Sequence, residues 1–263
     1  MYLMVLFLIG LMASVIGAIC GIGGGVIIKP VIDILGLTDV SSASFLSACT
    51  VLMMTAYSVL RGLKNKQDSK IDVKNVAPLA IGAAFGGLVG KMVFEGIKTF
   101  LPFSDMIGSY QAVVLGIVAA GTLLYTKNKK NIKTKRLSSP IISLLFGMAL
   151  GCMSSFLGIG GGPIDLVVLY YFFSMDTKTA VQNSLFIIFI SQLFGIGFTV
   201  FTNTVPDVSI FEIFVMAAGG IGGGILGRKI NAKIDSEVVD KLFMAVLFII
   251  IIISVYNFFN YLN

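Results

Sequence analysis

The chain has 263 residues, of which 57% are hydrophobic and 12% are charged, and its mean hydropathy is +0.98. A soluble protein carries about 25% charged residues, so this composition excludes a soluble globular domain and indicates an integral membrane protein. The net charge of +6 does not indicate nucleic-acid binding, because the basic residues cluster in loops between apolar runs, where they set orientation in a bilayer.

Ten apolar runs follow one another along the chain, and most approach the ~20 residues that span the hydrocarbon of a bilayer. They cover residues 3–20, 26–36, 41–62, 74–93, 107–126, 140–157, 163–175, 178–202, 208–228 and 241–260. The two short runs, 26–36 and 163–175, are predicted to be half-helices. The run 3–20 is predicted to be a retained first span, because it lacks the basic start and the cleavage site of a signal peptide.

Each short run follows a glycine string, and the second string repeats the first at a distance of 137 positions. The strings are Gly21-Ile22-Gly23-Gly24-Gly25 and Gly158-Ile159-Gly160-Gly161-Gly162. A glycine cluster breaks a helix and lets other groups approach the bare backbone. The same offset aligns residues 82–91 with 219–228 without a gap. It therefore predicts two transmembrane repeats, 1–126 and 138–263, joined by a basic linker at 127–137.

The basic residues decide how the two repeats are oriented. If each glycine string is a turn, each repeat has five segments and the second is inverted; if each string only kinks a long helix, the repeats are parallel. With turns, all basic residues except Lys29, Lys91 and Lys98 lie at or beside one face, which is then cytoplasmic. The sequence thus predicts an all-α integral membrane protein of two inverted five-segment repeats. It has about eight full spans plus half-helices, lies in the cell membrane, and has both termini outside.

Inverted repeats with a glycine-broken helix in each half are typical of secondary transporters, whose binding site lies at the breaks. A helix that starts inside the membrane presents unpaired N–H groups and a positive dipole end, and an anion suits both. Glycine lets the anion approach these amides. The glycines predicted to bind substrate are Gly21, Gly23, Gly24, Gly25, Gly158, Gly160, Gly161 and Gly162.

These motifs resemble the TauE/SafE sulfite exporter family, also called the TSUP permeases. The resemblance rests on the paired Gly-x-Gly-Gly-Gly strings, Lys29-Pro30, the stretch from Ala43 to Ser47 and the Gly-Gly-x-x-Gly-(Lys/Arg) endings, and it covers essentially the whole chain. It implies transport of small sulfur-containing anions such as sulfite and organosulfonates. One departure is that Val167 stands opposite Pro30, which puts symmetric substrate contacts in doubt.

Three charged residues follow the glycine strings. Lys29 and Asp33 lie one helical turn apart. Either Lys29 attracts the anion while Asp33 restrains the Lys29 side chain, or Lys29 extends its ammonium group to the membrane interface. Asp165, where the first repeat has Ile28, is either a protonatable gate that couples transport to protons or a stabiliser of the helix start. Because the chain has no histidine, a proton relay has to use carboxylates such as these.

Polar residues open the third and eighth runs and are further candidates for substrate binding. They are Ser47, Thr50, Gln182, Asn183 and Ser184. The alternative for each is a hydrogen bond that holds two helices together. The glycines of 82–90 and 219–227 are predicted to pack helices closely instead of binding substrate.

The sequence therefore predicts a secondary transporter of small sulfur-containing anions that works by alternating access, with proton coupling left open. It predicts no catalytic residue, no metal, no cofactor and no nucleic-acid partner, and it leaves a homodimer open. The alternatives are an anion channel of the same architecture or a carrier of another small organic anion. A cysteine-based carrier is disfavoured, because Cys20 aligns with Leu157 and so has no counterpart in the second repeat.

Overall fold

The computed structural model describes residues 2–64, 69–100, 107–137, 139–159 and 162–262. These residues form ten α-helices and no strand, which confirms the all-α fold. The helices are α1 (Tyr2–Cys20), α2 (Gly25–Ile34), α3 (Val40–Lys64), α4 (Val73–Phe100), α5 (Ile107–Asn128), α6 (Pro140–Leu157), α7 (Pro163–Phe173), α8 (Thr177–Phe201), α9 (Ile210–Lys233) and α10 (Ser236–Leu262). A 3-10 turn, η2 (Lys129–Asn131), follows α5.

Eight of these helices are long and apolar enough to cross a membrane, as predicted. The two short ones are α2, with 10 residues, and α7, with 11. At 1.5 Å per residue each is roughly 15 Å long, about half the thickness of the hydrocarbon. They are half-helices, and each one directly follows a glycine string.

The first glycine string reverses the chain. Gly21, Gly23 and Gly24 all have positive φ angles, a conformation that residues with a side chain rarely adopt. A Cβ atom placed on Gly17 would lie 2.3 Å from the amide nitrogen of Gly24, so α2 folds back along the end of α1. In one straight helix these two residues would be separated by roughly 10 Å. The string is therefore a turn between two helices.

The second string begins in the same way. Gly158 follows the last residue of α6 in the left-handed conformation, with φ of 66°. Gly162 then packs beside Ser154, eight residues earlier, with 3.6 Å between a Cβ placed on Gly162 and the Ser154 hydroxyl. Gly160 and Gly161 lie outside the described residues. The chain again turns back before α7 begins.

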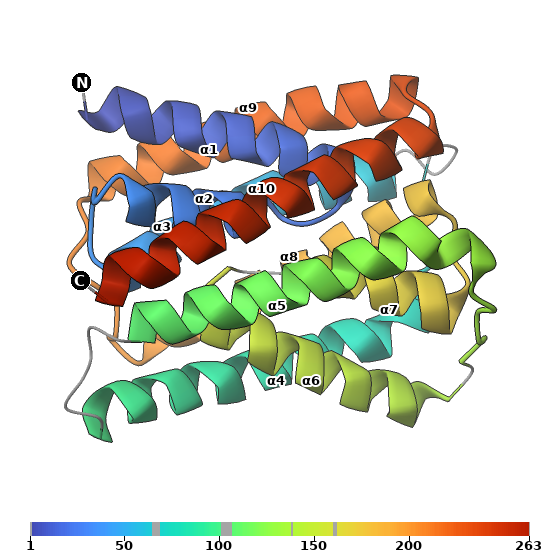
Figure 1. Ribbon diagram of the computed structural model, residues 1–263, viewed down its shortest axis with the longest axis horizontal. Coiled ribbons are helices and arrows are strands. Elements are labelled where there is room, and N and C mark those ends of the chain that lie inside the picture. Colours follow the sequence, from blue (N-terminus) through green and yellow to red (C-terminus); the bar gives the residue numbers. More distant parts are fainter. Residues whose placement is uncertain (1, 65–68, 101–106, 138, 160–161, 263) are drawn as a thin grey trace.

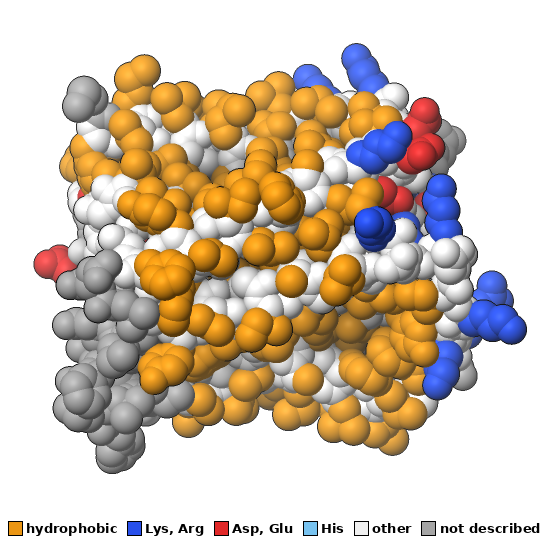
Figure 2. All heavy atoms as spheres, viewed as in Figure 1, with side chains coloured by type: hydrophobic (Ala, Val, Ile, Leu, Met, Phe, Trp, Pro, Cys, Tyr) orange, Lys and Arg blue, Asp and Glu red, His pale blue; other side chains and the backbone are white. Residues whose placement is uncertain are grey.

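Figure 1 shows the long helices running roughly along one axis, with the start of α1 and the end of α10 at the same end of the molecule. Figure 2 shows that Lys and Arg side chains gather at the opposite end and that apolar side chains cover the face between. Many large apolar side chains of the protein are exposed, among them Ile141, Phe201 and Phe214. Such a belt is expected for helices in contact with lipid.

Glycines let the helices approach until their backbones touch. On α4, Gly82, Gly86 and Gly90 face the carbonyl oxygens of α6, and a Cβ on any of them would lie 1.9–2.4 Å from such an oxygen. On α9, Gly223 and Gly227 pack in the same way against α1. These contacts confirm that the glycines of 82–90 and 219–227 pack helices closely, because no side chain fits at the contacts.

The helix boundaries follow the offset found in the sequence. Helices α3 and α8 have 25 residues each and begin 137 positions apart, at Val40 and Thr177. Helices α4 and α9 begin at Val73 and Ile210, which is the same distance. Under this offset α4 corresponds to α9 and α1 corresponds to α6. The helix pairs α4–α6 and α9–α1 are therefore equivalent, and both pack closely. The division into repeats 1–126 and 138–263 stays a prediction with which this pattern agrees.

Candidate functional site

The two glycine strings meet inside the protein. Gly25, the first residue of α2, contacts the second string so closely that a Cβ would lie 2.0 Å from the carbonyl oxygen of Ile159. A Cβ on Gly158 would lie 2.4 Å from the hydroxyl of Ser44 and 3.2 Å from the ammonium nitrogen of Lys29. Only glycine fits at these two positions. The strings thus bring the start of α2, the end of α6 and the first turns of α3 to one place.

Lys29 lies at this meeting point and is 4% exposed. It is in α2, about one turn after Gly25, and its ammonium group donates to the carbonyl oxygen of Leu157 at 2.9 Å. It also donates to the side-chain oxygen of Gln111 on α5. Leu157 is the last residue of α6, where carbonyl groups have no partner within the helix and the dipole end is negative. Lys29 therefore holds its charge inside the protein and does not extend it to a membrane interface.

The second hydrogen-bond partner of Lys29 is itself held in place. Gln111 is 4% exposed, and its amide nitrogen donates to the carbonyl oxygen of Phe156 at 2.6 Å. Because a carbonyl oxygen can only accept, this contact fixes which end of the amide faces Lys29. Gln111 and the end of α6 together position the ammonium group.

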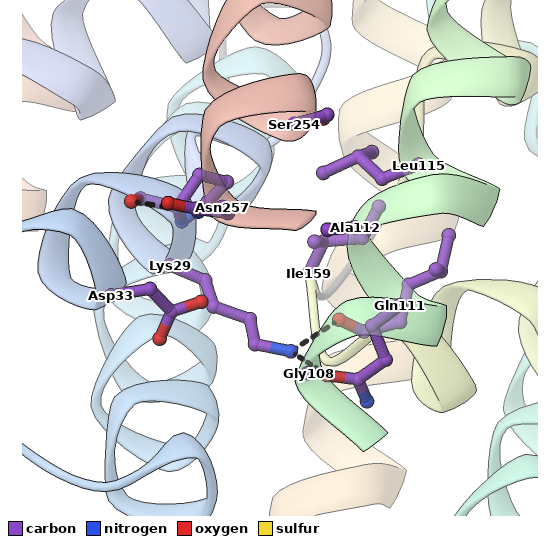
Figure 3. A pocket seen from close by; sticks show the side chains of 11 residues that line it. Lys29, Asp33, Gly108, Gln111, Ala112, Leu115, Ile159, Ser254 and Asn257 are labelled. Atoms are coloured by element: carbon purple, nitrogen blue, oxygen red, sulfur yellow. Dashed lines mark hydrogen bonds between the residues drawn. The ribbon is translucent and has the colours of Figure 1, made fainter. Parts of the chain in front are cut away.

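A small pocket opens beside Lys29, between α2, α5 and α10, as Figure 3 shows. Lys29 and Asp33 point into it from α2, and Asn257 extends towards α2 from α10. Its wall is completed by residues of α5, α10 and the second glycine turn. The lining residues are Lys29, Pro30, Asp33, Gly108, Gln111, Ala112, Leu115, Leu157, Ile159, Ser254 and Asn257.

Asp165 lies near the start of the other half-helix. It is 3% exposed and is the third residue of α7, and its carboxyl group accepts from the amide of Gly162 at 3.4 Å. This contact stabilises the start of α7, which is one of the two roles that the sequence predicts for Asp165. Asp165 does not line the pocket of Figure 3, whereas Asp33 does.

A family model for the sulfite exporter TauE/SafE matches residues 6–254 of this chain. The chain belongs to the TauE/SafE sulfite exporter family. It is thus a multi-pass membrane transporter and not an enzyme.

Three curated relatives of this TauE/SafE protein are all called probable membrane transporter proteins. YunE of Bacillus subtilis is 25% identical over 95% of this chain and 96% of its own length. MJ0441 of Methanocaldococcus jannaschii is 26% identical over 88% of this chain and 87% of its own length. A protein of Haemophilus influenzae is 25% identical over 95% of this chain and 97% of its own length. No solved structure is significantly similar to this TauE/SafE chain.

Ser47 and Ser184 of this TauE/SafE transporter, which are 137 positions apart, both contact the first glycine string. Ser184 donates to the carbonyl oxygen of Gly21 at 2.7 Å. Ser47 lies beside Gly25, with 2.9 Å between its hydroxyl and a Cβ placed on that glycine. The hydroxyl of Ser47 is buried and has no hydrogen-bond partner among the residues that the structure describes. Both serines thus lie beside the first glycine string, and their role in substrate binding stays a prediction.

Three other predicted site residues lie elsewhere in the TauE/SafE fold. The hydroxyl of Thr50 donates to the carbonyl oxygen of Leu46 in its own helix, and its backbone packs against Gly220. Gln182 accepts from the amide of Lys70 at 2.9 Å. Asn183 accepts from the amide of Asp72 and donates to the carbonyl oxygen of Lys70, each at 2.9 Å. The two amides hold the segment before α4 at the basic end.

The pocket of this TauE/SafE transporter contains three polar residues that were not predicted: Gln111, Ser254 and Asn257. Under the offset of 137 they align with Phe248, Ile117 and Ala120, so the repeat gave no signal for them. A weaker signal was present. Gln111 and Asn257 are amides inside apolar runs, where an amide needs a partner and is seldom placed without a reason.

Proposed function

We propose that the protein transports small anions across the cell membrane by alternating access, with Lys29 as the group that holds the substrate. The observation that carries this proposal is the buried ammonium group of Lys29 beside a pocket at the meeting point of the glycine strings. Sulfur oxyanions and organosulfonates are the proposed substrates, as the family description suggests.

The chemistry of the pocket supports an anion. The hydrogen bonds of Lys29 go to two neutral acceptors, a backbone carbonyl and an amide oxygen. An ammonium group has three donors, so one remains for a ligand. Away from water, attraction between this charge and an anion is several times stronger than in bulk solvent. A neutral solute would gain nothing comparable.

The arrangement of the helices supports alternating access. The half-helices α2 and α7 occupy equivalent places under the 137 offset, as expected of inverted repeats that meet near the membrane midplane. The pocket of Figure 3 lies beside α2. Beside α7, the ammonium group of Lys129 binds Asp240 at 2.7 Å and lies 4.1 Å from the centre of the Tyr170 ring. We propose that this cluster closes the cytoplasmic end.

Both ends of the chain are proposed to face the outside. They lie at the end of the molecule opposite the gathered Lys and Arg side chains (Figures 1 and 2). The positive-inside rule then places the basic end in the cytoplasm. Proton coupling through Asp165 or Asp33 is part of the same proposal, because intramembrane carboxyl groups are costly to keep without a role.

Transport by purified protein in liposomes tests the function. Labelled sulfite should accumulate against its concentration gradient when a proton gradient is imposed, and Lys29→Gln should reduce the rate at least tenfold. Lys133→Gln is the matched control, because Lys133 is exposed in the linker. Equal rates for Lys29→Gln and the control would contradict the proposal. Sulfite that only equilibrates under every imposed gradient would rule out coupled transport.

A further inference from the structure

The wall of the pocket formed by α10 carries two buried polar side chains that protein contacts do not satisfy. Ser254 and Asn257 are each 3% exposed and lie one turn apart. The Ser254 hydroxyl and the Asn257 side-chain oxygen have no hydrogen-bond partner among the residues that the structure describes. Leaving buried polar atoms unpaired is costly, so these two atoms at a pocket point to a ligand.

The orientation of the Asn257 amide is fixed by its other contact. Its nitrogen donates to the backbone carbonyl oxygen of Pro30 at 3.3 Å, a dashed line in Figure 3. Because that carbonyl can only accept, the amide oxygen of Asn257 is the atom left without a partner. An amide oxygen accepts and cannot donate. A ligand in the pocket can therefore satisfy this oxygen only with an N–H or O–H donor.

The pocket thus offers both kinds of polar group. Lys29 and Ser254 supply donors, and Asn257 and the carboxyl group of Asp33 supply acceptors. Lysine 29 is the one cationic side chain among the residues described as lining the pocket. The two negative charges of a dianion would be balanced only by the one positive charge of Lys29, and the dianion would also face the carboxyl group of Asp33. A monoanion without a donor would leave the Asn257 oxygen unpaired.

We propose that the substrate is a monoanion that keeps at least one N–H or O–H donor, with its charged oxygens towards Lys29 and Ser254 and its donor towards Asn257. The proposal rests on the anion-transport function and adds to it a preference within the class of small sulfur oxyanions. Hydrogen sulfite and sulfonates that carry an amino or hydroxyl group meet the requirement. Sulfate and simple alkyl sulfonates do not.

Two nearly isosteric probes separate these cases. Sulfamate and methanesulfonate are both tetrahedral monoanions of similar size, and only sulfamate carries N–H donors. Binding of their potassium salts to the purified full-length protein is measured by titration calorimetry, together with potassium sulfate. Sulfamate should bind about tenfold more tightly than methanesulfonate, the effect expected of one buried hydrogen bond, and sulfate should bind more weakly than sulfamate.

Asn257→Leu tests whether Asn257 accepts the hydrogen bond from the N–H group of sulfamate. It should bring the affinities for sulfamate and methanesulfonate to within about twofold of each other, mainly by weakening sulfamate. Asn260→Leu is the matched control, since Asn260 is exposed on the same helix, and it should keep the tenfold preference. A preference that survives Asn257→Leu overturns the role assigned to Asn257.

The wild-type comparison decides the proposal even where Asn257→Leu does not fold. Equal affinities for the two monoanions, or tighter binding of sulfate, overturn the preference and leave the anion-transport function standing. No binding of any of the three anions, together with no transport of sulfite, overturns both. A tenfold preference for sulfamate that Asn260→Leu keeps and Asn257→Leu removes is the supporting result.

Discussion

Lys91 donates a hydrogen bond from its ammonium group to the carbonyl oxygen of Gly195, with 2.5 Å between nitrogen and oxygen. Arg228, 137 positions after Lys91, donates in the same way to the carbonyl oxygen of Ser58, which precedes Gly195 by the same distance. The first contact joins α4 to α8, and the second joins α9 to α3. The same kind of contact thus occurs at equivalent positions in both halves of the chain, which supports the proposed inverted repeats.

These two contacts should contribute similar amounts to stability. A hydrogen bond from a charged group is worth roughly 1.5–3 kcal/mol, so Lys91→Met and Arg228→Met should each lower the free energy of unfolding by about 2 kcal/mol. Thermal unfolding in detergent measures the change. Lys229→Met, at an exposed position next to Arg228, should have almost no effect. If only one of the two contact variants loses stability, the contacts are not equivalent.

The proposed orientation predicts which loops a membrane-impermeant thiol reagent reaches. In a variant without Cys20, Cys49 and Cys152, a cysteine at Asp207 should be labelled from outside intact cells, because the α8–α9 loop lies at the end where both termini lie. A cysteine at Lys133, in the basic linker, should be labelled only after the cells are opened. Both positions are exposed. The opposite pattern would invert the proposed topology and contradict the positive-inside assignment.

The helices and their breaks were predictable from the sequence because they follow from local properties. Apolar length sets the eight spans, and glycine clusters set the two turns. The predicted run 140–157 matches α6 at both ends, and the predicted starts at 41 and 178 each lie one residue inside α3 and α8. The sequence leaves two alternatives for Lys29, since its burial depends on how α2 folds back against the end of α6.

The pocket was harder to predict because it is not symmetric. Gln111 and Asn257 lie on α5 and α10, far in sequence from the glycine strings, and the repeat aligns them with apolar residues. The sequence predicts Gln182 and Asn183 as binding residues because they are polar and open the eighth apolar run. The structure instead shows them bound to the backbone of residues 70 and 72. An amide needs a partner, and the sequence does not say whether that partner is substrate or backbone.

The role of Asp165 can be separated into its two parts by two substitutions. Asp165→Asn keeps an oxygen that accepts from the Gly162 amide but cannot ionise, whereas Asp165→Leu removes both properties. If the carboxyl group couples transport to protons, Asp165→Asn should abolish anion-driven proton flux in liposomes while leaving thermal stability within about 1 kcal/mol of the wild type. If Asp165 only caps α7, Asp165→Asn should behave like the wild type and Asp165→Leu should be destabilised.

Asp176 makes stability depend on pH at the start of α8. Partial burial alone would raise its pKa, but hydrogen bonds from Thr179 and the charge of Lys70, 3.6 Å away, bring the pKa below its usual value. A carboxyl group with a lowered pKa stabilises the fold above the unfolded value of ~3.9, and the effect is lost as pH falls through the folded value. Asp176→Ala should thus cost about 1 kcal/mol at pH 7 and less at pH 3. Asp207→Ala, in an exposed loop, should show no such change, and a constant cost for Asp176→Ala would contradict the argument.

The cluster at the basic end should control access from the cytoplasm. Asp240 on α10 accepts from Lys129 at 2.7 Å and from the Thr177 hydroxyl at 3.0 Å, and both members of the ion pair are less than one-fifth exposed. Because η2 directly follows α5, and α5 and α10 both line the Lys29 pocket, we expect opening of the proposed cytoplasmic end to separate Lys129 from Asp240. Asp240→Asn removes the charge, so the closed arrangement loses roughly 1 kcal/mol and opens about fivefold more often.

Cys20 reports this opening, because it is fully buried at the end of α1, beside the first glycine string. In a variant without Cys49 and Cys152, a thiol reagent added from the cytoplasmic side should modify Cys20 about fivefold faster when Asp240→Asn is present. Glu237→Gln is the control, since Glu237 pairs with Lys241 on the exposed face of the same helix. Equal rates in the two variants would show that the Lys129–Asp240 pair does not close the cytoplasmic end. A faster reaction from the outer side would show that the cluster closes the other end instead.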